Sequence, residues 1–523
     1  MPWKKRQESK YRQFYPKRCL NFDNFTHLCN KSLSKMEKNT KLPEILIASS
    51  DKKLSAMITR LKKEEKLQKI ASRVYTTNLT DTPENIVRRN LYKIIGQLYP
   101  GALISHRSAF ELRPSADGHL YLTYGYTKNV SLPGIVLHLV AGPKPIEKDI
   151  PYLDGLFISN PARAYLENLQ LGYVRNGVSK CIPQAQLEEK LEKKLLANGE
   201  NELNRLRDEA RSISGQLQMG NEFKLLDKII GAILSTREAE ALKGEAAKAW
   251  AAGEPYDPER INLFSTLYEH LSQKDFKHYT DINGAETAYK NFAFFESYFS
   301  NYIEGTEFEV EEAKQIVDTG VALPTRDEDS HDVLGTFYIT SNRKEMSILP
   351  KDPNDLINIL QRRHSILLSA RPTKTPGLFK EQNNKAGNSH FVDYRLVRGT
   401  LKKGFEIYNA IQDPVAKAYF ILFMISEVHP FMDGNGRISR IMMNAELTAA
   451  GMPKIIIPTV YRIDYIDALK RLTQNGEPAT IIRAMERVRL WSSSLDGSDY
   501  DALRTSLEQC NAFRDEQEYI LKF

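Results

Sequence analysis

The stretch HPFMDGNGRISR, residues 429–440, lies between two apolar segments of the chain. The segment before it is predicted to be a helix, because Asp413 suits an N-cap and Pro414 suits the first turn. That helix is expected to stop at the His-Pro pair, since proline cannot continue a helix and disfavours helical geometry in the residue before it. A second apolar helix follows and runs through Leu447. The sequence therefore predicts a helix, a loop and a helix within a mainly α fold.

The loop has the composition of an anion-binding site. Gly434, Asn435 and Gly436 permit positive φ at successive positions, so their backbone N–H groups can converge on an anion. This nest opens onto the N-terminus of the second helix, whose dipole favours phosphate. Arg437 and Arg440 are three residues apart in the first turns of that helix, so both can lean toward one polyphosphate. The loop is therefore predicted to bind phosphate groups.

Two further residues of the stretch suit phosphoryl-type transfer. Asp433 is a carboxylate beside the nest, where it can hold Mg²⁺. His429 lies at the mouth of the loop, and histidine titrates near neutrality, which suits a general base. A His-Pro pair and a Gly-Asn-Gly turn are each common as structural features alone. Their combination in this order favours a nucleotide-dependent transfer site.

The complete stretch 429–440 resembles the signature of the Fic family. The resemblance implies an all-helical core and a reaction in which a Tyr, Thr or Ser hydroxyl of a protein attacks the α-phosphate of ATP. By the same resemblance His429 takes the hydroxyl proton, and Asp433 binds Mg²⁺. The nest with Arg437 holds the phosphates, and Arg440 reaches the terminal one. An acidic residue at position 433 favours nucleotidyl transfer over the family's phosphocholine and phosphoryl chemistries.

More of the Fic pattern can be followed along the chain. Residues 376–380, followed by residues 388–392, resemble the β-hairpin flap over the site, whose edge could hold an extended target segment. Asn444 and Tyr465 resemble family positions that contact the ribose or base of the nucleotide, although core packing explains Tyr465 equally well. The Fic-like part, with its inhibitory and C-terminal helices, is expected to span residues 286–523.

A candidate inhibitory switch precedes this core. Aromatic residues at helical spacing predict a helix over 284–303, followed by Gly305 as its C′ residue. Glu304 in the last turn opposes the helix dipole, and Arg440 could offset that charge. For an isolated glutamate, a solvated surface position is the ordinary interpretation. However, Ser300-x-x-x-Glu304-Gly305 resembles the inhibitory motif of Fic proteins, which implies that Glu304 pairs with Arg440 and blocks the γ-phosphate.

The N-terminal half is predicted to be a regulatory region. Residues 1–40 form a basic segment, and residues 41–78 read as a helix followed by a basic hairpin, which is typical of a winged helix-turn-helix. From Lys52 to Arg73 there are eight basic residues against two acidic ones. Such charge could attract DNA through residues 1–78, although many basic runs are only solvated faces.

The next two segments complete the predicted domain order. Residues 79–184 are predicted to form a small α/β domain, with turn signals at Asp117-Gly118 and Pro133-Gly134. Segments within residues 104–163 resemble AbiEi-type antitoxins, which join a winged helix to such a domain and repress their own operons. Residues 185–285 are predicted to be a helical connector with exposed, charged faces.

Composition narrows the class of protein. The 523 residues carry a net charge of +7, with 41% hydrophobic and 27% charged residues. No apolar run is long enough to span a membrane, and the basic start lacks the apolar run of a secretory signal, so we expect a cytoplasmic protein. The four cysteines are widely spaced, which argues against a disulfide framework or a zinc site.

These observations favour a protein adenylyltransferase that is autoinhibited by Glu304. Its expected partners are a protein substrate, which could be the chain itself, and DNA, and it could form oligomers. A different class remains open, in which the chain is a DNA-binding, antitoxin-like repressor and the Fic part senses nucleotide. A pure sensor would not need His429. A third interpretation is a Fic enzyme that removes AMP from a modified target.

Overall fold

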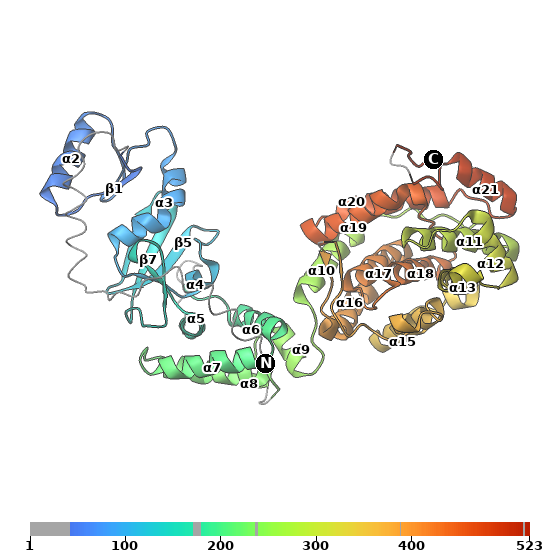
Figure 1. The fold of residues 1–523 in the computed structure, drawn as a ribbon, viewed down its shortest axis with the longest axis horizontal. Coiled ribbons are helices and arrows are strands. Elements are labelled where there is room, and N and C mark those ends of the chain that lie inside the picture. The colour runs from blue at the N-terminus through green and yellow to red at the C-terminus, as the bar shows by residue number, and fades with distance from the viewer. Residues whose placement is uncertain (1–41, 171–178, 236–238, 388, 516–517) are drawn as a thin grey trace, which may run out of the picture. The chain divides into compact units, whose positions relative to one another are not determined.

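The computed structural model describes residues 42–170, 179–235, 239–387, 389–515 and 518–523. The chain divides into two compact units, which carry separate hydrophobic cores (Figure 1). The first unit takes in the described residues up to Ile182 together with Ile213–Met219. The second unit takes in Pro183–Ser212 and Gly220–Phe523.

The first unit begins with one helix and a small antiparallel sheet of strand order β1-β3-β2. Its elements are β1 (Ile45–Ile47), α2 (Lys52–Lys63), β2 (Gln68–Ala71) and β3 (Val74–Thr76). Asp51 caps α2 because its side chain accepts hydrogen bonds from the N–H groups of Lys53 and Leu54. A helix followed by a hairpin is therefore present, as the sequence indicated. The winged helix-turn-helix over 41–78 remains a prediction, and the basic segment 1–40 lies outside the described residues.

A mixed six-stranded sheet of order β6-β7-β5-β4-β9-β8 forms the rest of this unit. Its strands are β4 (Leu103–Ile104), β5 (His119–Tyr124), β6 (Lys128–Leu132), β7 (Ile135–Ala141), β8 (Ile150–Pro151) and β9 (Phe157–Ile158). The helices are α3 (Pro83–Leu98), α4 (Arg107–Glu111) and α5 (Pro161–Asn168). Gly134 has a φ of +72° in the turn between β6 and β7, where the sequence signalled a turn. Likeness to AbiEi-type antitoxins remains a prediction.

The helices that follow only partly behave as an exposed connector. They are α6 (Gln184–Asn198), α7 (Glu200–Ser214), α8 (Gly220–Ile233), α9 (Glu245–Ala251) and α10 (Pro258–Ser272). Phe264, Leu267 and Leu271 of α10 are at most 1% exposed and belong to the core of the second unit. The predicted connector over 185–285 is therefore wrong for α10. The apolar face of α10 packs against the core of the second unit, and the charge pattern of the sequence does not indicate this packing.

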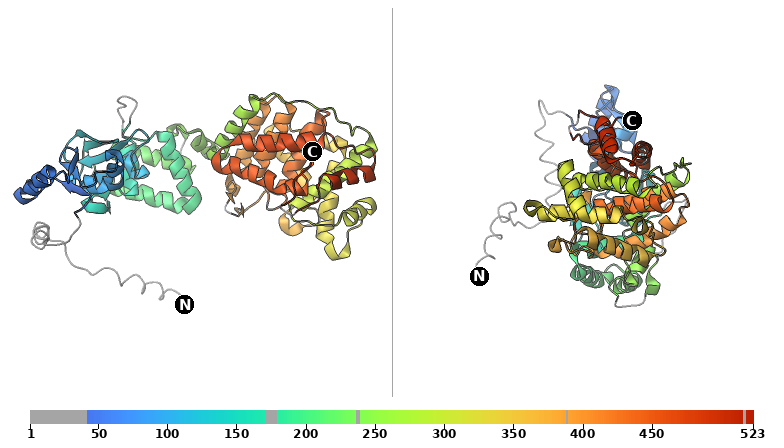
Figure 2. Two further views of the ribbon diagram at one scale, coloured as in Figure 1. Left: turned by 90° about the horizontal axis from the view of Figure 1, so that it is seen from above. Right: turned by 90° about the vertical axis from the view of Figure 1, so that its right-hand side faces the viewer.

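The rest of the second unit is almost entirely helical, which confirms the mainly α prediction (Figure 2). Its helices are α11 (Glu286–Ile303), α12 (Val310–Thr319), α13 (Asp327–Thr340), α14 (Arg343–Met346), α15 (Pro353–Leu367), α16 (Val397–Ala410), α17 (Pro414–Val428), α18 (Asn435–Ala449), α19 (Arg462–Asn475), α20 (Pro478–Ser492) and α21 (Tyr500–Gln509). The helices α17 and α18 pack against each other in the middle of the unit (Figure 1).

Helix α17 is the centre of this core. Asp413 caps it by accepting hydrogen bonds from the N–H groups of Val415 and Ala416, as predicted. Almost all of its side chains are buried, rather than a single stripe, because neighbouring helices surround it. It ends at His429, whose φ of +51° lies in the left-handed region. The loop before α18 is thus fixed at both ends by buried helices.

A short hairpin stands where a flap was predicted, but its first strand lies later in the chain. β10 (Lys385–Ala386) pairs with β11 (Ser389–His390). The predicted first strand at 376–380 is wrong, because this segment is held elsewhere. The N–H of Lys380 donates to the carbonyl oxygen of Pro430 at 2.9 Å. The segment therefore anchors the hairpin to the loop instead of forming it.

Two further features concern membrane-spanning helices and the cysteines. None of the helices in the described ranges is long and apolar enough to cross a bilayer. Cys181 is buried and Cys510 is half-buried, and both are free thiols. Cys19 and Cys29 lie outside the described residues.

Candidate active site

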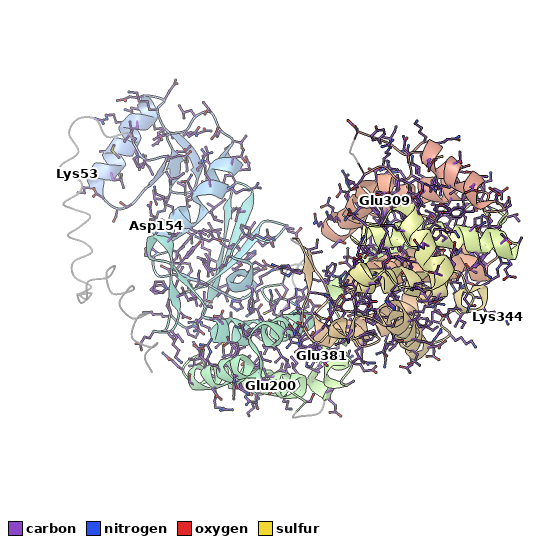
Figure 3. All side chains as sticks on the ribbon, turned by 45° about the vertical axis from the view of Figure 1, so that its right-hand side comes forward. Lys53, Asp154, Glu200, Glu309, Lys344 and Glu381 are labelled. Atoms are coloured by element: carbon purple, nitrogen blue, oxygen red, sulfur yellow. The ribbon has the colours of Figure 1, made fainter. Side chains whose placement is uncertain are left out.

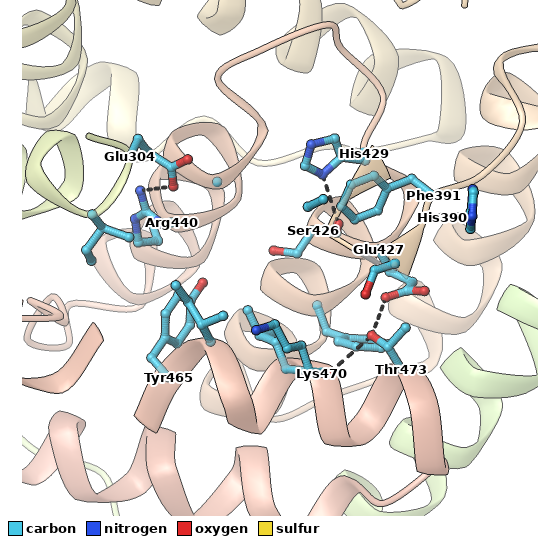
Figure 4. A pocket seen from close by; sticks show the side chains of 17 residues that line it. Glu304, His390, Phe391, Ser426, Glu427, His429, Arg440, Tyr465, Lys470 and Thr473 are labelled. Carbon is cyan, nitrogen blue, oxygen red and sulfur yellow. Dashed lines mark hydrogen bonds and ion pairs between the residues drawn. The ribbon is translucent and has the colours of Figure 1, made fainter. Parts of the chain in front are cut away.

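The residues of the predicted site meet around a pocket of ≈ 210 Å³ in the second unit (Figure 4). The end of α11, the flap, α17, α18 and α19 all contribute to its lining. Among the lining residues are Glu304, Phe391, His429, Arg440 and Tyr465. Figure 4 shows Glu304 and Arg440 on one side of this pocket and His429 with Phe391 on another.

His429 is held in place by its backbone and by two neighbours. Its ring stacks on that of Phe391, with centroids 3.7 Å apart and planes 5° from parallel. Its Nδ1 lies 3.3 Å from the carbonyl oxygen of Ser426. Since a carbonyl can only accept, Nδ1 carries the proton in this contact, and Nε2 remains an acceptor. The ring is therefore in the tautomer that a general base requires.

Burial sets the protonation state of this histidine. The pKa of His429 is lowered to about 4, mainly by burial and also by the nearby Lys380 ammonium, although the Ser426 carbonyl and Glu304 oppose the shift. The imidazole is consequently neutral at pH 7. A neutral ring beside the pocket can accept a proton from a hydroxyl group.

We expect the Phe391→Ala change to raise the pKa of His429 from about 4 toward the ordinary value of 6.5, because water would then reach the ring. The change should be followed by NMR titration of the histidine resonances, with His429→Asn used for assignment. Phe379→Ala is the matched control, since the Phe379 ring packs on Phe431 instead of His429. An unchanged His429 titration in Phe391→Ala would contradict this account.

Buried side chains hold the loop after His429 in its conformation. Asn435 accepts a hydrogen bond from the N–H of Phe431 and donates to its carbonyl oxygen, both at 2.9 Å. His364 stacks on the Phe431 ring at 3.7 Å, and its Nε2 lies 3.1 Å from the carbonyl oxygen of Asp433. The Asn435 side chain therefore shapes the loop, while its backbone N–H remains the group predicted to bind phosphate.

The backbone after this loop retains the predicted anion-binding character. Gly434 is the N-cap of α18 with a φ of +73°, and it offers no side-chain acceptor to the first turn. The first N–H groups of a helix have no partner within the helix. The N-terminus of α18 can therefore bind an anion through the backbone of Asn435, Gly436 and Arg437.

Glu304 and Arg440 form the predicted pair. Arg440 Nη2 lies 2.8 Å from Glu304 Oε1, and the same nitrogen donates to the carbonyl oxygen of Ser300 at 2.8 Å. Arg440 Nε donates to Ser300 Oγ at 3.0 Å. Although burial lowers the pKa of Arg440, the Glu304 carboxylate and Tyr465 raise it above its usual value. The end of α11 is thereby tied to α18.

The Glu304 carboxylate also covers the start of α18. A Cβ atom placed on Gly436 would lie 2.1 Å from Glu304 Oε1. Glycine is therefore required at position 436 for this approach. The Glu304 carboxylate lies against the first turn of α18, close to where the sequence predicted a phosphate.

Arg437 is held differently from the prediction. Its Nη1 lies 2.7 Å from Asp332 Oδ2 and donates to Asn301 Oδ1 at 3.2 Å. Arg371 Nε is 3.0 Å from the same carboxylate oxygen. Asp332 is only 1% exposed and was missed by sequence analysis, because nothing near residue 332 marks it as a partner of residue 437.

Replacing Asp332 with alanine is expected to destabilise the protein by about 3–5 kcal/mol, because it leaves two guanidinium groups without their shared buried carboxylate. Urea unfolding followed by tryptophan emission would measure the loss. Asp332→Asn keeps one of the two acceptor oxygens and should cost less. Asp467→Ala, at an exposed pair with Lys470, is the control and should cost below about 1 kcal/mol.

Asp433 fits the role of a magnesium ligand only in part. Its side chain is 36% exposed, with Oδ1 accepting from the N–H of Gly434 at 2.7 Å and Oδ2 3.5 Å from Lys374 Nζ. Although burial raises the pKa of Asp433, Arg437 and these neighbours lower it below its usual value. No group of three or more His, Cys, Asp or Glu suited to a metal occurs in the described parts of the chain. One carboxylate suffices for Mg²⁺ when phosphates supply the other ligands.

The two remaining predicted nucleotide contacts, Tyr465 and Asn444, lie in different surroundings. Tyr465 lines the pocket beside Arg440, as predicted. Asn444 does not line it, because its amide donates to Glu296 and to the carbonyl oxygen of Ile455, both at 2.9 Å. Its oxygen accepts from the N–H of Ile455 at 2.8 Å. The contact of Asn444 with the nucleotide remains a prediction.

Comparisons with known proteins point to one family of sequences. Residues 355–447 match the model of the Fic/DOC family. Curated relatives named protein adenylyltransferase Fic, from Drosophila sechellia and Drosophila melanogaster, are each 28% identical over 209 residues, which cover 39% of this chain and 42% of the relative. The chain thus spans less than half the length of these relatives.

Similar solved structures carry Fic names as well. The Fic-1 protein from C. elegans is 16% identical with a TM-score of 0.33, covering 62% of this chain and 97% of that chain. A Fic domain containing signaling protein from Bacteroides thetaiotaomicron is 17% identical with a TM-score of 0.34, covering 50% of this chain and all of the other.

Proposed function

Because residues 355–447 form a Fic domain, we propose that this chain transfers AMP from ATP to a hydroxyl group of a protein. The observation that carries the proposal is a neutral, buried His429 at the mouth of a loop that opens onto a helix N-terminus without a side-chain cap. The names of the curated relatives, protein adenylyltransferase Fic, support the same reaction class.

The reaction assigns a task to each part of the site. His429 Nε2 takes the proton as the hydroxyl oxygen of the target bonds to the α-phosphorus of ATP. The bond from that phosphorus to the bridging oxygen breaks, and pyrophosphate leaves. The first N–H groups of α18 hold the phosphates, while Tyr465 packs near the nucleotide. Asp433 would hold Mg²⁺, which when bound neutralises charge on the phosphates.

Glu304 restrains this reaction in the proposal. Its carboxylate covers Gly436 and engages Arg440, so a terminal phosphate meets a like charge and lacks its arginine. The chain is then active only when the Glu304–Arg440 pair opens.

Labelling with ATP tests the reaction. The Glu304→Gly chain should incorporate label from α-³²P-ATP with Mg²⁺, into itself or into an added protein mixture, and none from γ-³²P-ATP. Transfer of γ-label would indicate phosphoryl transfer, which would overturn the proposal. Release of AMP from a pre-labelled protein, without forward labelling, would indicate a Fic enzyme that removes AMP.

A second function, DNA binding, is favoured by one observation in the first unit. All eight basic residues from Lys52 to Arg73 are exposed on α2 and its hairpin, including Lys53, which Figure 3 labels. We propose that this surface binds duplex DNA through its phosphates. The logarithm of its affinity for DNA should then fall linearly with the logarithm of the salt concentration between 50 and 200 mM. The slope depends on the number of phosphates contacted. Binding that does not depend on salt would contradict it.

A further inference from the structure

A second pocket of ≈ 340 Å³ shares two flap residues, His390 and Phe391, with the candidate active site. We call it the acidic pocket. Most of its lining comes from residues 189–262, before the matched range 355–447, while His390, Phe391, Asp393 and Leu396 lie within that range; none of the lining belongs to the motif at 429–440. Its defining lining residues are Glu189 and Glu192 of α6, Trp250 of α9, Tyr256, and the flap residues His390 and Phe391.

Negative charge dominates this lining. The acidic residues are Glu189, Glu192, Asp257, Glu259 and Asp393, against Lys193 and Arg260. Both cations are already engaged: Lys193 Nζ lies 2.6 Å from Glu259 Oε1, and Arg260 Nε lies 2.9 Å from Glu427 Oε1. Glu259 is thus paired, and Asp393 Oδ1 lies 2.9 Å from Arg395 Nε, so the lining is acidic in composition with part of its charge already neutralised.

Glu192 is the lining residue that most clearly indicates a ligand. It is 6% exposed, and its Oε1 has no hydrogen-bond partner among the described residues. Burial raises the pKa of Glu192 to about 8, with Glu189 and Glu188 adding to the shift. A buried acceptor atom without a hydrogen-bond donor costs free energy. A carboxyl group whose pKa is raised in this way lacks a nearby cation that would stabilise its charged form. A cationic donor entering the pocket would correct both defects.

The other walls suit the rest of a long basic side chain. Trp250, Tyr256 and Phe391 supply aromatic surface, against which an aliphatic stem packs and a cationic group is attracted to the ring faces. Arg260 Nη2 donates to the carbonyl oxygen of His390 at 2.6 Å, which ties the flap to the wall formed by α10. One extended segment lying along the flap could thus reach both pockets.

We propose that the acidic pocket binds a lysine or arginine side chain of the same protein segment whose hydroxyl is modified at His429. The proposal rests on the proposed function, and it assigns a preference for targets with a basic residue at a fixed distance from the hydroxyl. The pocket volume suits a single side chain, and its charge excludes an acidic one. Phe391 connects the two sites, since it stacks on His429 and lines the acidic pocket.

A binding experiment tests the pocket without relying on catalysis. The full chain is titrated with N-acetyl-arginine amide and, as control, with N-acetyl-norleucine amide, while tryptophan emission is recorded. We expect a saturable change with the arginine probe alone, a roughly tenfold weaker affinity in Glu192→Gln, and loss of the signal in Trp250→Phe. Equal responses to both probes, or an unaltered affinity in Glu192→Gln, would overturn the proposal.

A labelling experiment then tests the link to the reaction. The Glu304→Gly chain is given α-³²P-ATP and a peptide library with one central hydroxyl residue. Lysine and arginine should be enriched several-fold at one position, and this enrichment should vanish with Glu192→Gln added, whereas Glu200→Gln on α7 serves as the matched control. Labelled peptides without a basic preference would overturn this proposal alone. Absence of any α-label, with arginine binding retained, would instead count against the proposed transfer reaction.

Discussion

Replacing His429 with alanine in the Glu304→Gly chain is expected to lower the rate of AMP transfer by about 10²- to 10⁴-fold, the usual contribution of a general base. The expectation follows from geometry and charge together. The ring is neutral, its Nδ1 is committed to the Ser426 carbonyl, and Phe391 fixes its plane, so Nε2 is the atom left to take the proton. Initial rates of α-³²P incorporation measure the effect.

Two further variants make this prediction specific. His429 has a φ of +51°, which alanine tolerates poorly, so alanine could act partly through the backbone. Asparagine tolerates that conformation, and His429→Asn should lose transfer to the same extent as His429→Ala. His270→Ala, an exposed histidine on α10, should retain transfer. Activity retained in His429→Asn would mean that the ring is not the base.

Replacing Glu304 with glycine should raise the rate of transfer about 5- to 150-fold, the usual range for coupling between two states. Wild type holds Arg440 against the Glu304 carboxylate at 2.8 Å, and that carboxylate covers Gly436. Removing it frees the guanidinium and the helix N-terminus for phosphate. The same labelling assay, at saturating ATP, measures the rise.

Charge and size can be separated at this position. Glu304→Gln keeps the size and removes the charge, so a rise similar to that of Glu304→Gly would identify charge repulsion as the restraint. Glu307→Gly, at an exposed glutamate three residues away, is the matched control and should leave the rate unchanged. A Glu304→Gly rate no higher than wild type would contradict autoinhibition.

Features that depend on residues close together in the sequence could be predicted from it. The helix before His429 follows from Asp413, Pro414 and the His-Pro pair, which act within a few residues of themselves. The pairing of Glu304 with Arg440 was predicted from a resemblance, and the structure brings the two together. The first strand of the flap was misplaced because Lys380 is fixed by Pro430, fifty residues later, and no local pattern records that bond.

Long-range packing explains what the sequence could not disclose. Asp332 binds Arg437 across 105 residues, and the Asn444 amide donates to Glu296 and to the Ile455 carbonyl oxygen, contacts that position along the chain does not indicate. The acidic pocket also depends on such contacts, because Glu192 reads locally as one more charge on a solvated helix.

By itself, the sequence determined the mainly α class and the loop at 429–440, since helix caps, proline and glycine act through neighbouring residues. Only the tertiary structure decided that His429 is neutral, that Arg437 is engaged by Asp332, and that Glu192 lines a pocket. These properties depend on burial and on partners far away along the chain, which a linear pattern does not contain.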